Sequence, residues 1–247
     1  MRTRLKNWSA ALAAIVAFSS AASAQTAAPQ AVGPDLSGIW QKSGGGSGLI
    51  PGEPPMTDWG REKFLAAKPI HGPRTVSPTE SNAAELQCLP MGIPGIYFRP
   101  RTFQIVQLPR RAVMLFEVDH LWREIYMDGR SFPEVPLHTW MGYSIGHYEG
   151  DTLVIESRQF RGWEENAHRW VDRLGHPFSS ELRVVERFRR TSHDRLVNEI
   201  TIDDPVAYTG QWTATMTYAL QEDGFEMGEF VCQELMLSDL PFMRPER

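Results

Sequence analysis

The chain is poor in cysteine, with only Cys88 and Cys232 among its 247 residues. Neither cysteine has a histidine near it at metal-ligand spacing, so the pattern does not favour a zinc site. In an oxidising compartment the two would form a disulfide that ties the N-terminal irregular part to the last strand. Two separate buried thiols remain the alternative, since free cysteine is commonly buried.

Recognised catalytic and cofactor motifs are also missing. The sequence has no Gly-x-Ser-x-Gly and no His-Glu-x-x-His, and the glycine run at residues 43–48 lacks the Lys-Ser/Thr of a phosphate loop. Basic residues are not in excess, because the formal net charge is −5 at pH 7. An acidic surface argues against a nucleic-acid partner. We therefore expect no cofactor, no metal and no nucleic acid.

Long apolar runs are absent after the N-terminus. Residues 1–24 carry three early basic residues, an alanine-rich run and small residues ending at Ala24, which is the layout of a secretory signal peptide. The run is too short to span a membrane. We expect cleavage after Ala24, a flexible leader over 25–34, and a periplasmic or secreted protein with no integral membrane segment.

What the chain does have is a succession of short strand patterns separated by turn residues. A helix is expected after the N-cap Thr57, and residues 68–100 are rich in proline, glycine and serine. Short connections favour an antiparallel meander that closes on itself. We predict one all-β domain over 35–247, a closed or nearly closed barrel of the calycin/lipocalin-like type with short helices and a long N-terminal irregular region. Segment 159–180 interrupts the meander and is a possible lid. The expected strands are 35–40, 102–108, 112–118, 120–127, 142–149, 152–158, 181–190, 195–202, 211–220 and 225–233.

Alternation along these strands places polar residues on apolar faces. Trp212 and Tyr218 alternate with threonines and so face inward, while Glu186, Asn198 and Glu229 each lie between apolar neighbours. A buried carboxylate without a partner costs several kcal/mol or has a raised pKa. Each of these groups therefore needs an arginine, a hydrogen-bond donor, water or a ligand.

The stretch DHLWREIYMDGR at residues 119–130 leaves two interpretations open. One face carries a polar and aromatic set, His120, Trp122, Glu124 and Tyr126, and the other carries Leu121, Arg123, Ile125 and Met127. The first set would make the wall of an internal cavity. Alternatively, the second set faces the core and the first is solvated.

The next hairpin has two similarly distinct faces. A two-residue turn at residues 150–151 would place Tyr143, His147, Glu156 and Arg158 on one face. We expect His147 and Glu156 on the outside, because charged residues are usually exposed.

The ordered motifs SGIW, QCLPMGIPG, FQIVQ, WREIYMDGR, TWMGYSIGHYEGDTLVIES, ERFRR, TIDDPVAYTGQWT and EFVCQE resemble a widespread, largely uncharacterised family of exported bacterial proteins over about residues 35–234. The resemblance implies export but carries over no established activity. This chain has Tyr143 where relatives often have His, and it lacks the histidines of their DGRPHP and HSE segments. If those histidines serve chemistry in relatives, this member has a changed or lost activity.

Three functions fit these features. The first is a cofactor-independent lyase, isomerase or hydrolase acting on a small aromatic or terpenoid compound, with Glu186, Glu124 and His120 as catalytic groups. The second is a carrier of a hydrophobic ligand, and the third is a structural envelope protein. Both small-molecule functions use the same candidate ligand-binding residues, which are Trp122, Tyr126, Tyr143, Asn198, Trp212, Tyr218, Glu229, His168 and His176.

Overall fold

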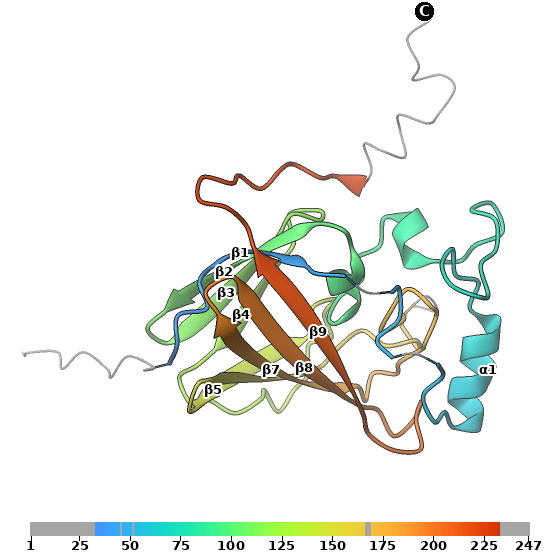
Figure 1. The fold of residues 1–247 in the computed structure, drawn as a ribbon. Coiled ribbons are helices and arrows are strands. Elements are labelled where there is room, and N and C mark those ends of the chain that lie inside the picture. The colour runs from blue at the N-terminus through green and yellow to red at the C-terminus, as the bar shows by residue number, and fades with distance from the viewer. Residues whose placement is uncertain (1–32, 45, 51, 166–168, 233–247) are drawn as a thin grey trace, which may run out of the picture.

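The computed structural model describes residues 33–44, 46–50, 52–165 and 169–232. Its strands form one closed barrel in chain order, because β1 pairs with both β2 and β9 (Figure 1). The prediction of an all-β, mainly antiparallel closed barrel is therefore confirmed. The strands are β1 (Gly38–Lys42), β2 (Thr102–Leu108), β3 (Arg111–Phe116), β4 (Trp122–Tyr126), β5 (Tyr143–Glu149), β6 (Thr152–Arg158), β7 (Arg183–Ser192), β8 (Arg195–Asp203) and β9 (Trp212–Leu220).

Two features of the sheet depart from a simple antiparallel meander. β4 and β5 pair in parallel, through Ile125 with Ser144 and Tyr126 with Ile145, after a connection long enough to return the chain to the same end. The predicted strand at 225–233 is wrong within the described residues, where Phe230 forms only an isolated bridge to Val118. β1 already occupies the free edge of β9, so no sheet edge remains for another strand.

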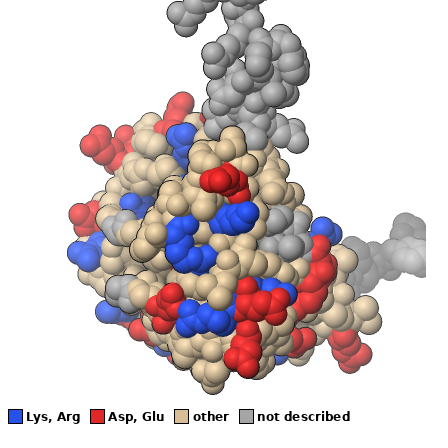
Figure 2. Space-filling model, turned by 90° about the vertical axis from the view of Figure 1, so that its right-hand side faces the viewer, with Lys and Arg blue, Asp and Glu red and all other residues tan. Residues whose placement is uncertain are grey.

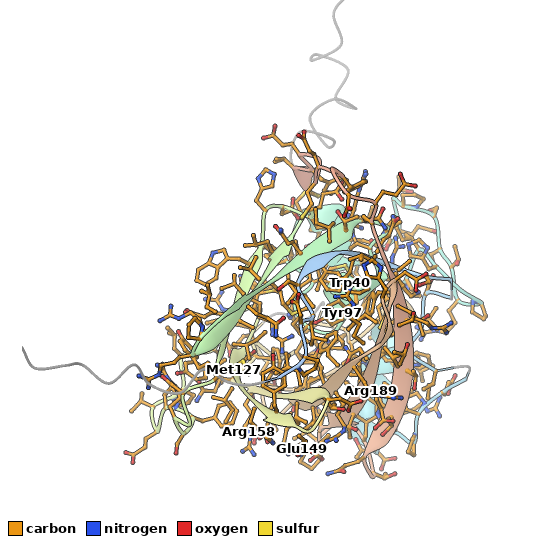
Figure 3. All side chains as sticks on the ribbon, turned by 60° about the vertical axis from the view of Figure 1, so that its left-hand side comes forward. Trp40, Tyr97, Met127, Glu149, Arg158 and Arg189 are labelled. Atoms are coloured by element: carbon orange, nitrogen blue, oxygen red, sulfur yellow. A yellow bond between two sulfur atoms is a disulfide. The ribbon has the colours of Figure 1, made fainter. Side chains whose placement is uncertain are left out.

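The barrel interior is filled by side chains rather than left open. Figure 3 shows Trp40 and Tyr97 inside the ring of strands, where they are 0% and 3% exposed. Tyr97 comes from the short 3₁₀ helix η2 (Gly95–Phe98), and its ring centroid lies 5.9 Å from those of both Phe116 and Tyr218. η2 thus plugs the barrel with an aromatic side chain. The Tyr97 ring is thus packed among aromatic side chains of the barrel interior.

The described part of the N-terminal irregular region covers one end of the barrel, together with residues 159–165 and 169–182. Helix α1 (Asp58–Ala66) lies at this end (Figure 1), and the Thr57 side chain accepts a hydrogen bond from the Gly60 N–H at 3.0 Å, which confirms the predicted N-cap. A second 3₁₀ helix, η1 (Ala84–Gln87), precedes Cys88, which forms a disulfide with Cys232. The disulfide ties η1 to the segment after β9, and the Thr57 hydroxyl donates to the Val206 carbonyl between β8 and β9 at 2.6 Å.

The predicted lid is a packed part of this end. Arg169 is 1% exposed, and its guanidinium donates to the backbone carbonyls of Pro90 at 2.6 Å, Arg161 at 3.0 Å and Trp140 at 3.4 Å. Burial lowers the pKa of Arg169 to about 9, with the nearby Arg161 acting in the same direction. One buried cation therefore joins three loops at this end of the barrel.

Candidate functional site

The centre of the barrel holds a polar cluster around Glu186. The Arg123 Nη2 lies 2.5 Å from the Glu186 Oε2, and the Tyr97 hydroxyl donates to the Glu186 Oε1 at 2.8 Å. The Asn198 amide donates to the same oxygen at 3.2 Å, and Arg123 also donates to the Ser157 hydroxyl at 2.6 Å. Glu186 is 0% exposed and lines none of the hollows described below. The buried Glu186 carboxylate is therefore compensated by an ion pair and hydrogen bonds from the protein itself.

The predicted cavity wall on β4 is the outer face of the barrel. Trp122 is 60% exposed and His120 lies on the surface, while Arg123 and Ile125 of the same stretch are buried. The prediction that His120, Trp122, Glu124 and Tyr126 line an internal cavity is therefore wrong. The physical reason is that Arg123 has a buried carboxylate partner across the barrel, so its face is the one that points inward.

Two of these outer residues take part in surface contacts. Glu124 pairs with Arg111 and accepts a hydrogen bond from the Tyr126 hydroxyl at 2.9 Å. The Tyr126 ring stacks on Tyr143 with centroids 5.1 Å apart, and the Arg130 guanidinium lies 3.9 Å from the Tyr126 centroid. These residues form an outer aromatic cluster, separate from the barrel interior.

The remaining predicted site residues lie in different places. Asn198, Trp212 and Tyr218 face the interior as expected and are 8% exposed or less. Glu229 is exposed on an irregular segment, so its predicted inward position is wrong. His168 lies outside the described residues.

His176 is the predicted residue that the structure places beside a hollow. Its Nδ1 lies 2.6 Å from the Asp172 Oδ2, with the two side chains 1% and 0% exposed. The Asp172 carboxylate also accepts from the backbone N–H groups of Leu49 at 3.2 Å and Leu174 at 3.0 Å. Because an ionised carboxylate only accepts, the His176 Nδ1 is the donor of this bond. Neutral His176 therefore carries its lone pair on Nε2.

The backbone around His176 is shaped to bring this dyad against α1. Gly175 has a φ of +90°, and a Cβ at this position would lie 2.8 Å from the Cβ of Ala67. The His176 ring stacks on Phe64 of α1 with centroids 4.9 Å apart and planes 6° apart. A glycine is needed here both for the positive φ and for the close approach.

The hollow beside this ring, which we call the His176 hollow, measures about 240 Å³. It brings together an N-terminal loop, α1, the loop after α1 and the predicted lid. Aromatic and aliphatic walls with a few polar groups are typical of small-molecule sites. Its lining residues are Gly52, Glu53, Phe64, His71, Pro73, Arg74, Leu174 and His176.

Arg74 is the cation of the His176 hollow. Its guanidinium carbon lies 3.8 Å from the centroid of the Phe64 ring, and its Nη2 donates to the carbonyls of Phe64 and Ala67 at the end of α1. Desolvation is the main cause that lowers the pKa of Arg74, and Glu53 partly opposes it. Burial likewise lowers the pKa of His71, with Arg173 acting in the same direction and Glu85 opposing.

A larger hollow of about 600 Å³ adjoins the first and shares Gly52, Pro73 and Leu174 with it. Ser43, Gly44, Gly46, Ser47 and Gly48 form much of its wall, together with the β9 threonines Thr215 and Thr217. Lys42 lines this hollow and donates to the Gly46 carbonyl at 2.9 Å. Figure 2 faces the side on which α1 lies and shows basic and acidic side chains intermixed there.

Within the described residues, no three His, Cys, Asp or Glu side chains gather as a metal ion would require. In the same part of the chain, no helix has the length and apolarity to cross a membrane.

The sequence named His176, Glu186 and the Glu186 partner Asn198, but not Asp172, Arg123 or Tyr97 as partners of these groups. Asp172 lies four residues before His176, with Gly175 between them. This short spacing is the feature of the sequence that could have predicted their contact. Arg123 is the single charged residue on one face of β4, and Glu186 lies between apolar neighbours on one face of β7. If both faces point inward, the two charges are expected to pair. Tyr97 and Arg74 come from irregular segments with no periodic pattern.

Comparisons with known proteins give little further information. No family model matches the chain, and no curated protein matches it. Among solved structures, a crystal structure of a single-substitution mutant of the fluorescent protein UnaG is similar, with 14% identity, a TM-score of 0.32, and coverage of 76% of this chain and 97% of that one. A likeness at this level says nothing about what this chain binds.

Proposed function

We propose that the protein is a cofactor-independent small-molecule enzyme whose acid-base group is His176, oriented by Asp172 at the wall of the His176 hollow. The observation that carries this proposal is the buried contact of 2.6 Å between the His176 Nδ1 and the Asp172 Oδ2 beside a hollow of about 240 Å³. A carboxylate on one ring nitrogen fixes the tautomer and stabilises the protonated ring.

The chemistry follows from this arrangement. Nε2 of neutral His176 accepts a proton from a substrate bound in the hollow, and the imidazolium formed lies against the Asp172 carboxylate. The protonated ring then returns the proton to another atom of the substrate or to the leaving group. Proton transfer of this kind serves an isomerase, a lyase or a hydrolase. Phe64, Pro73 and Leu174 supply an apolar wall for an aromatic or terpenoid body.

Glu186, Glu124 and His120 have a weaker case as the acid-base groups. Glu186 is enclosed by its ion pair in the filled barrel, and Glu124 and His120 lie on its outer surface. We also propose that the protein works in the periplasm or outside the cell. This part of the proposal is supported by the signal-peptide pattern and by the disulfide.

The test is incubation of the purified protein with a mixed panel of aromatic and terpenoid compounds, followed by mass spectrometry of the bound and free fractions. We expect a new mass that is absent from a heat-killed control and is lost in His176→Gln. His147→Gln is the matched control, because His147 is also paired with a carboxylate, Glu149, but lies exposed on β5.

The other functions give different results in the same experiment. A compound that is enriched on the protein and recovered unchanged would make the protein a carrier and would contradict catalysis. No binding and no thermal stabilisation by any compound would favour a structural envelope protein.

A further inference from the structure

We propose that the ligand of the His176 hollow is an organic anion, with a carboxylate or phosphate group beside Arg74 and an apolar body against Phe64 and Leu174. This inference rests on the proposed function, because it concerns the same hollow, and it adds the charge of the substrate. The inference is based on Arg74, a cation in the wall of the hollow that has no directly paired carboxylate among the described residues.

Arg74 has no ionic partner in the part of the chain that the structure describes. Among the described residues, no carboxylate lies within 4.0 Å of its guanidinium, whose Nη2 donates only to two carbonyls at the end of α1. Its Nη1 is buried and has no hydrogen-bond partner there. The carboxylate that shares the hollow, Glu53, is already paired with Arg61. Glu53 still acts on Arg74 from a distance, but a partly desolvated cation without a directly paired carboxylate is costly, so an anionic ligand would offset this cost.

Lys42 is a second cation without a paired carboxylate among the described residues, and it lies in the adjoining hollow. In the described part of the chain it has no carboxylate partner within 4.0 Å, and its Nζ donates to a backbone carbonyl, that of Gly46. Burial and the nearby Arg173 both lower the pKa of Lys42. The two joined hollows thus each carry one cation without an ionic partner, while the protein as a whole has a net charge of −5.

The arginines that line a third hollow have ion-pair partners, unlike Arg74. This hollow measures about 440 Å³ and is lined by two arginines, Arg158 and Arg183. Glu156 forms an ion pair with each of them, at 2.6 Å and 2.9 Å. Arginines at that hollow are neutralised within the protein, in contrast to Arg74. Arg74 also differs from Arg169, because the Arg74 Nη1 has no hydrogen-bond partner among the described residues, whereas Nε, Nη1 and Nη2 of Arg169 each donate to a carbonyl.

Arg74 is also placed to act on a planar ligand group. The α1 carbonyls and the Phe64 ring hold its guanidinium at the wall, and the same ring stacks on His176. An anion at Arg74 would thus hold the ligand body close to the acid-base group. Charged partners bind a guanidinium more strongly than neutral acceptors do.

The experiment uses phenylacetate, phenyl phosphate and the neutral analogue phenylacetamide with the full chain. Binding is followed by the imidazole NMR signals of His176, with those of His147 as an internal reference. We expect at least one anion to bind about 10-fold more tightly than the amide. The preference between phenylacetate and phenyl phosphate then identifies the anionic group. Raising the salt concentration should weaken binding of the anion and leave the amide nearly unaffected.

The variant Arg74→Gln should reduce binding of the anion to the level of the amide. Arg189→Gln is the control, because Arg189 is an exposed arginine on β7, away from the hollow. Equal binding of anion and amide at His176, or a preference that survives in Arg74→Gln, would overturn the inference and leave the proposed site standing. If none of the three compounds shifts the His176 signals, both proposals fail. The salt series on the unmodified protein tests the charge preference even if Arg74→Gln folds poorly.

Discussion

The Arg123 Nη2 and the Glu186 Oε2 meet at 2.5 Å in the middle of the barrel, with side chains 1% and 0% exposed. This contact joins β4 to β7 across the barrel interior, and Tyr97 from η2 donates to the same carboxylate. The strands and the plug are thus held by one buried charge pair. Removing one member of such a pair leaves the other charge buried without compensation.

We therefore expect Glu186→Gln to lower the free energy of unfolding by about 3 to 5 kcal/mol, because Arg123 would be left uncompensated. Urea unfolding measures this loss. The matched control is Glu124→Gln on the outer face of the barrel, which should cost below about 1 kcal/mol. The double variant Arg123→Met/Glu186→Leu should recover part of the stability. A Glu186→Gln protein as stable as the parent would show that the pair contributes little.

Arg169→Lys should destabilise the protein by about 2 kcal/mol or more, because a single ammonium cannot reach the three carbonyls that the guanidinium serves. Thermal or urea unfolding gives the value. Arg195→Lys at the exposed β7–β8 hairpin is the control and should change stability by less than about 0.5 kcal/mol. An equal, small effect of both variants would argue against Arg169 as the joint between these loops.

Asp172→Asn should lower turnover of any substrate found in the panel by about 100-fold or more, because the amide no longer fixes the useful tautomer of His176 or stabilises the imidazolium. Steady-state kinetics of the folded variant provides the measurement. Glu149→Asn, which removes the carboxylate beside the exposed His147, is the control. Full turnover in Asp172→Asn would remove the dyad from the mechanism.

Glu156 provides a pH-dependent contribution to stability. Its hydrogen bond from Arg183, and then that from Arg158, hold its pKa below the ordinary 4.5 despite partial burial. Because the folded pKa is lowered, the stabilisation is present above pH 4.5 and is lost as the pH falls through the folded pKa. Urea midpoints of Glu156→Gln should fall less steeply than those of the parent in this acid range. Parallel curves for the two proteins would contradict this account.

The disulfide closes a loop with a sequence separation of 144 residues. Replacing both Cys88 and Cys232 by serine should cost up to about 4 to 5 kcal/mol, since a long loop restricts the unfolded chain strongly. Comparison of the oxidised parent, the reduced parent and the double serine variant measures this effect. Similar stabilities in all three states would mean that the covering region is held by packing alone.

The sequence predicted the interior faces of β7, β8 and β9 correctly. Alternation placed Glu186, Asn198 and Tyr218 on inward faces, and each is 0% exposed. It left β4 undecided because one face held three apolar residues with Arg123 and the other held aromatic and polar residues together. The partner that resolves β4 is Glu186, 63 residues later, and the periodicity of one strand contains no information about it.

The strand predicted at 225–233 illustrates a second limit. Its residues alternate as those of a strand do, but a strand also needs a free edge, and the pairing of β1 with β9 removes it. The filled interior is a third case, because Tyr97 comes from an irregular segment whose sequence shows no pattern that points into the barrel. The sequences of the strands are equally compatible with an open barrel interior and with one filled by a side chain from another segment.

Local sequence patterns were enough to predict the all-β class, most strand positions and the N-cap of α1, and they named His176 as a candidate ligand-binding residue. These features depend on the alternation and turn residues of neighbouring positions in the chain. Contacts between distant segments set the pairing of Arg123 with Glu186, the outward position of Trp122 and the place of the His176 hollow beside α1. Those outcomes depend on closure and packing between distant segments, and the order of residues within one segment does not specify them.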